Sequence, residues 1–208
     1  MNPIDIFFAP EKAVKEALDK PNMAVAIFLI IMPMVLSVIY AMLLGFNVTL
    51  NSFNMFAKDV VIWVIGVIIF YFLLMIFKGK KANLSFYGIF AATSLIKAIQ
   101  VAAMTVFLIA MFLFGQQYLD TAKGMISSGQ DISNKEVMSQ LQNIEVESTM
   151  SLLIGSSIVF VIFLLLFFLG VYVFYKIVDK TGKSTFIGNL LILFIYFVIL
   201  GVLTRFFG

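Results

Sequence analysis

Five long stretches of the chain carry almost no charge, and each is long enough to cross a lipid bilayer as a helix. A hydrocarbon core about 30 Å thick needs roughly 20 apolar residues, because a helix rises about 1.5 Å per residue. Lipid offers the backbone no hydrogen-bond partners, so spans that do not alternate like barrel strands must be helical. The sequence therefore predicts an all-α, polytopic membrane helix bundle over residues 1–208, with about five transmembrane helices: 23–46, 59–77, 97–116, 149–175 and 185–206.

Composition removes most kinds of chemistry. The chain is 62% hydrophobic and 12% charged, whereas about a quarter of the residues of an ordinary soluble domain are charged. It contains no Cys and no His, which excludes disulfides, Cys/His metal sites and thiolate or imidazole catalysis. The carboxylates are scattered, and no basic face suits nucleic acid. We therefore expect no enzyme, no catalytic, cofactor-binding or metal-binding residues, no cofactor and no nucleic-acid partner.

The lysines and arginines of the connecting segments predict the orientation. If the amino terminus is cytoplasmic, the inner segments hold nine of them and the outer segments only four. Positive charge concentrates on the cytoplasmic side of membrane proteins. We therefore expect a multi-pass protein of the cell membrane, with the amino terminus inside and the carboxyl terminus outside. The inner set is Lys12, Lys15, Lys20, Lys78, Lys80, Lys81, Lys176, Lys180 and Lys183; the outer set is Lys58, Lys123, Lys135 and Arg205.

Residues 10–20, before the first span, have the pattern of an amphipathic helix. Pro10 suits a first helical turn, and Glu11 and Lys15 stand at the i,i+4 spacing that supports a helix. This predicts a short helix along the cytoplasmic face of the membrane. Its apolar face consists of Ala13, Val14, Ala17 and Leu18.

Two other segments lie outside the spans. Ser133 and Glu136 fit a capping box within residues 117–147, which predicts an outer helical hairpin that caps the bundle. Residues 84–96 form a polar segment before the third span, and we expect it to be interfacial.

Lys97 is the one charged residue whose depth the spans leave open. Thr93, Lys97 and Gln100 share one helical face and are the candidate functional polar residues in or near the membrane. If the helix begins at Leu84, Lys97 is buried in the membrane and is a functional contact. If the span begins near Ala98, Lys97 reaches the headgroups. We favour the second placement.

Two further features concern helix shape and packing. Pro33 lies near the middle of the first span and is the candidate helix kink, since proline removes a backbone hydrogen bond. Small residues recur at fourfold spacing, as in Gly88 with Ala92 and Ser94 with Ala98. Such ridges predict close helix–helix contact.

Two segments carry a family resemblance: the opening, Asn2–Leu18 (NPIDIFFAPEKAVKEAL), and the polar segment Leu84–Lys97 before the third span. With them the chain resembles the Yip domain family, whose eukaryotic members interact with Rab GTPases. Many members carry a proline early in the third span, whereas this chain has none after Pro33. With its brief amino-terminal region, the chain is similar to a prokaryotic-type member.

This resemblance implies a non-enzymatic membrane scaffold or adaptor that acts in membrane organisation or trafficking. Its expected partners are the lipid bilayer and other membrane proteins or a second copy of the chain; a GTPase partner is implied by the resemblance alone. The alternative is a small channel or transporter that uses the Lys97/Gln100 region.

Overall fold

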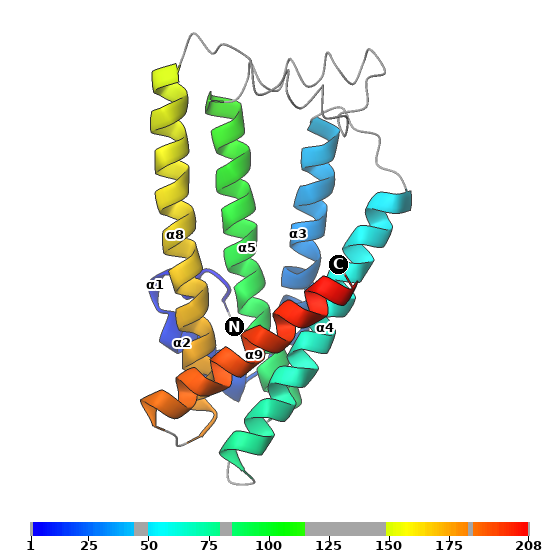
Figure 1. Ribbon diagram of the computed structural model, residues 1–208, viewed down its shortest axis with the longest axis vertical. Helices are drawn as coiled ribbons and strands as arrows, with labels where there is room; N and C mark the ends of the chain where they lie inside the picture. The colour runs from blue at the N-terminus through cyan, green and yellow to red at the C-terminus, as the bar shows by residue number, and fades with distance from the viewer. Residues whose placement is uncertain (1, 44–49, 80–84, 115–148, 183–184, 208) are drawn as a thin grey trace.

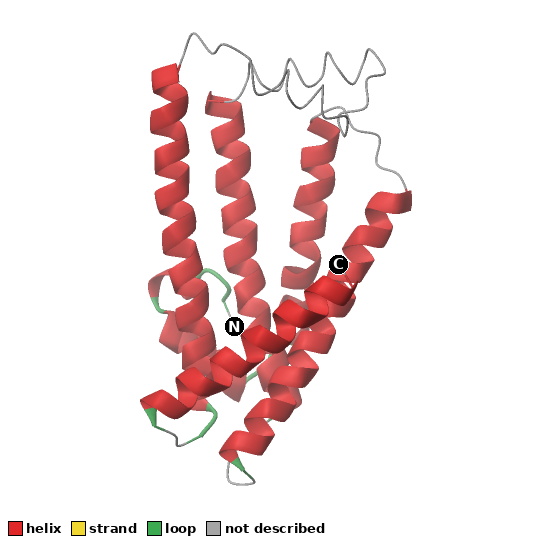
Figure 2. Cartoon of the chain, in the orientation of Figure 1, coloured by secondary structure: helices red, strands yellow, loops and turns green. Residues whose placement is uncertain are grey.

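The computed structural model describes residues 2–43, 50–79, 85–114, 149–182 and 185–207. Within these ranges the chain is helical and contains no strand, which confirms the predicted all-α bundle (Figures 1 and 2). The helices are α1 (Asp5–Phe8), α2 (Pro10–Asp19), α3 (Met23–Leu43), α4 (Leu50–Lys78), α5 (Phe86–Phe114), α8 (Thr149–Lys180) and α9 (Phe186–Phe207).

Five of these helices are long and apolar enough to cross a membrane: α3, α4, α5, α8 and α9. They run alternately up and down in Figure 1, so that the ends of α4 and α8 and the starts of α5 and α9 lie at one end of the bundle. The predicted outer cap, 117–147, lies outside the described residues. The architecture is therefore that of a multi-pass membrane protein.

Helices α5 and α4 begin earlier in the chain than the spans predicted for them. A single continuous helix, α5, runs from Phe86 to Phe114, so the predicted boundary at residue 97 is not a break in the helix; the interfacial placement of 84–96 stays a prediction. Thr93 and Lys97 are polar but helix-compatible, and hydropathy marks where apolar residues begin, not where a helix begins. For the same reason α4 begins at Leu50 and not near residue 59.

Packing joins the helices into one bundle. Helix α5 packs against α3 and α8, and α4 packs against α9. Aromatic rings fill the junction of α4, α8 and α9, where the Phe70 and Phe174 ring centroids lie 5.5 Å apart and those of Phe174 and Tyr196 lie 5.3 Å apart. Such pairs add to the burial of apolar area.

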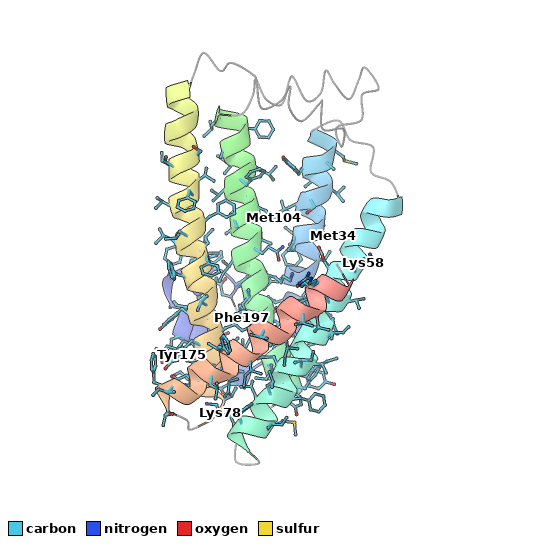
Figure 3. All side chains as sticks on the ribbon, viewed as in Figure 1. Met34, Lys58, Lys78, Met104, Tyr175 and Phe197 are labelled. Carbon is cyan, nitrogen blue, oxygen red and sulfur yellow. The ribbon has the colours of Figure 1, made fainter. Side chains whose placement is uncertain are left out.

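The buried side chains gather toward the end of the bundle where α5 begins and α8 ends. No residue of α5 from Gln100 to Ala110 is buried, and none of α8 from Ser156 to Tyr172. The same end holds α1, α2 and six described lysines, and we call it the lysine-rich end. Figure 3 shows Lys78 there and Lys58 much farther up α4. The six lysines are Lys12, Lys15, Lys20, Lys78, Lys176 and Lys180.

Candidate functional site

The residues singled out in the sequence occupy the middle of α5 and α3. Lys97 donates a hydrogen bond of 2.9 Å to the Gln100 side chain, so the structure brings these two together. Thr93 is buried, and its hydroxyl lies 2.8 Å from the Ile89 carbonyl oxygen of its own helix. The Thr93 hydroxyl therefore satisfies the backbone of α5, and the Lys97–Gln100 pair is a contact within one helix.

Pro33 is buried in the middle of α3, and the helix continues through it. The Ser37 hydroxyl donates a hydrogen bond of 2.9 Å to the Pro33 carbonyl oxygen. The Ser37 hydroxyl thus adds a hydrogen bond to the helix beside Pro33, which has no backbone N–H to donate. The kink itself stays a prediction.

A polar network that sequence reasoning missed joins α4, α8 and α9 at the lysine-rich end. The Lys78 ammonium, at the end of α4, donates a 2.8 Å hydrogen bond to the Asn189 side-chain oxygen and a 3.0 Å bond to the Gly182 carbonyl. The Asn189 amide nitrogen lies 3.5 Å from the Asp179 carboxylate. Asn189 is buried, with 1% of its surface exposed. Asn189 therefore connects a cation on one helix with an anion on another.

Helix α2 docks on this end through its apolar face. Ala13, Val14 and Ala17 are at most 1% exposed, and α2 packs on α5 and α8. The contact is close at Gly88, where a Cβ would lie 2.7 Å from the Leu18 carbonyl oxygen. The amphipathic helix predicted at 10–20 thus forms, and protein covers its apolar face. Glycine at position 88 is what allows the two backbones to meet.

Glu11 connects α2 to α8 electrostatically. One of its carboxylate oxygens lies 2.6 Å from the Lys180 ammonium, and the other lies 3.4 Å from that of Lys176. The hydrogen bonds to Lys180 and Lys176 hold the pKa of Glu11 below its ordinary value of 4.5. The two pairs are partly exposed, so each contributes modestly to stability. Their geometry nonetheless fixes the start of α2 against the end of α8.

The sequence contained a signal for this docking but not for the network. The i,i+4 pattern indicated a helix over residues 10–20, and the small residues at 88 and 92 indicated a close contact. Nothing local marks Asn189 as a bridge, because its partners lie far along the chain. The assembled site is a fixed helix and a charged network; among the described residues no cluster of acidic side chains suits a metal ion.

Comparisons of the chain with protein-family models, with curated proteins and with solved structures gave no match.

Proposed function

We propose that this chain is a non-enzymatic, Yip-like membrane scaffold or adaptor that presents α2 as a platform. The observation that carries the proposal is the docked α2: one face is buried on α5 and α8, and Glu11 is paired with two lysines of α8. The opposite face, which includes Lys15, Asp19 and Lys20, is exposed. A fixed helix with a charged outer face suits recognition of a protein partner, since its surface is ordered before binding.

The orientation we propose places this platform in the cytoplasm and the carboxyl terminus outside. Its support is the concentration of lysines at the end where α2 docks. The chain lacks cysteine, so single cysteines can report the side on which a position lies. In sealed right-side-out vesicles, an impermeant thiol reagent should label Lys58→Cys and spare Lys20→Cys. The reverse pattern would invert the topology.

The test of the platform is an affinity pull-down of the full-length protein from its native membranes. The double variant Asp19→Lys with Lys20→Glu rearranges the outer charges of α2 and preserves the net charge. The control is Lys58→Glu, an exposed position on α4. We expect partners of the unaltered protein to be lost from the double variant and retained by the control. Equal capture by both would contradict a platform on α2.

A small channel or transporter is the second candidate, and one observation favours it. Gln100, which accepts the hydrogen bond from Lys97, also lines an otherwise largely apolar cavity of about 300 Å³ between α5, α8 and α9. Purified protein in liposomes distinguishes the two functions. The scaffold predicts no flux of ions or small solutes, whereas a flux that changes on Lys97→Ala supports transport and contradicts the scaffold.

A further inference from the structure

A cavity of about 500 Å³ lies at the lysine-rich end, between the start of α2 and the end of α8. One part of its wall is basic, and another part is formed by a proline and a tyrosine ring. The lining residues are Ala9, Pro10, Glu11, Lys12, Lys15, Tyr172 and Lys180.

The cavity has more positive than negative charge. It is lined by three lysines and one carboxylate, and that carboxylate, Glu11, is already paired with Lys180 and Lys176. Among the residues that the structure describes, Lys12 has one ion pair, with a nitrogen–oxygen distance of 3.8 Å to Asp5, and its side chain is 74% exposed. Lys15 is exposed and has no ion pair within the described ranges. Lys12 and Lys15 are therefore available to an anion that enters the cavity.

An exposed apolar surface leads away from the cavity along α8. Phe168, Leu165 and Val161 follow Tyr172 at helical spacing, on the same face of the helix. They are 59%, 63% and 54% exposed, so they face lipid in a membrane. Next to the cavity on the chain, Phe8 is 84% exposed. Apolar side chains so exposed next to the lining residues Ala9 and Tyr172 place the cavity at the boundary between headgroups and acyl chains.

We propose that this cavity binds the headgroup phosphate of an anionic phospholipid, with an acyl chain along the Tyr172, Phe168 and Leu165 face of α8. Basic pockets between membrane helices bind anionic headgroups through this combination of charge and position. The apolar face favours a lipid over a free anion, because a free phosphate has no group to place on it. This inference does not require the adaptor function, since it concerns only the lipid.

The test is native mass spectrometry of the full-length protein in detergent, titrated with phosphatidylglycerol or phosphatidylcholine. We expect phosphatidylglycerol to bind more tightly. The double variant Lys12→Gln with Lys15→Gln should weaken its binding about 25-fold, roughly fivefold for each lysine near a charged surface. Both side chains are exposed, and thermal unfolding of the variant checks that it is folded. Lys58→Gln, which removes one positive charge at an exposed position of α4, should bind as the unaltered protein does.

Three results would overturn the proposal. The first is equal affinity for the two lipids, and the second is unchanged phosphatidylglycerol binding by the double variant. The third arm adds inorganic phosphate or glycerophosphoglycerol as competitor. Displacement of the lipid by either competitor at an equal concentration would show a site for a free anion, without a contribution from the acyl chain. Retention of the lipid supports the assignment.

Discussion

At the lysine-rich end, polar side chains connect different helices, whereas several polar groups in the middle of α5 bond within their own helix. Lys78 bonds to Asn189 of α9, and Glu11 of α2 pairs with Lys180 of α8. Farther up α5, Lys97 bonds to Gln100 and the Thr105 hydroxyl to the Val101 carbonyl. Bonds between helices hold the helices in register, while bonds within a helix only satisfy a polar group in an apolar setting.

The burial of apolar side chains follows the same division. Ile89, Leu95 and Val173 are fully buried near the lysine-rich end, whereas Ile109 and Phe160 are more than half exposed in the other half. We infer that the lysine-rich end is the rigid part of the bundle, and that α2 belongs to it. Substitutions should therefore cost far more at this end than their equivalents elsewhere.

The largest effect is expected from Val14→Asp, which puts a carboxylate on the buried face of α2. An unpaired buried charge costs about 3–5 kcal/mol. The free energy of docking sets the upper limit of this cost, because α2 can detach and hydrate the charge. We expect rapid tryptic cleavage after Lys15 in the variant, measured on detergent-solubilised protein. Lys12→Asp, on the exposed face, should leave cleavage after Lys15 slow, and equally slow cleavage in Val14→Asp would contradict the docking.

Gly88→Ala is expected to have the next largest effect. Its Cβ would lie 2.7 Å from the Leu18 carbonyl oxygen, a backbone atom that can move only if α2 moves. Overpacking of this kind typically costs about 1–3 kcal/mol. Gly170→Ala is the matched control, since nothing lies within 4 Å of a Cβ there. We expect a lower midpoint of thermal unfolding for Gly88→Ala alone; a decrease of equal size in both variants would count against the close contact.

Asn189→Ala tests the polar network against the Lys97–Gln100 pair. Loss of the side chain takes an acceptor from Lys78 in a partly buried position, a cost of about 1–3 kcal/mol. Gln100→Ala removes an acceptor from Lys97, but Gln100 is exposed and belongs to the same helix. The expected cost there is below about 0.5 kcal/mol, as for most surface changes. Unfolding in denaturant compares the two, and similar losses would remove the distinction between the lysine-rich end and the middle of α5.

The smallest effect is expected from pH. The pKa of Glu11 is lowered by its bonds to Lys180 and Lys176, so the docked state binds this proton less readily than the undocked state. The stabilisation of the docked state by ionised Glu11 is complete well above the ordinary pKa of 4.5. It is lost as the pH falls through the lowered pKa. Hydrogen exchange of α2, corrected for its intrinsic pH dependence, should therefore increase in acid. Glu11→Gln should lack this pH-dependent component, and an identical profile in both proteins would exclude Glu11 as its source.

The sequence was sufficient for the helices and for part of the site. The five apolar stretches and the pattern at 10–20 depend on local composition and spacing, which determine a helix and its apolar face. The continuity of α5 through residue 97 could not be predicted, because Thr93 and Lys97 interrupt the hydropathy without interrupting the helix. Asn189 could not be recognised, since its bridging role depends on how α4, α8 and α9 pack. The sequence directed attention to Lys97, whereas the network of Lys78, Asn189 and Asp179 that joins three helices lies at the lysine-rich end.

Carbodiimide coupling tests most directly whether α2 is docked at the lysine-rich end. This reagent joins a carboxylate to an amine only where they touch, and Glu11 touches Lys180. In intact membranes we expect an amide between Glu11 and Lys180 or Lys176, identified by mass spectrometry of the peptides and absent from Glu11→Gln. Activation of Glu11 with coupling only to other lysines, or to none, would contradict the docked position of α2.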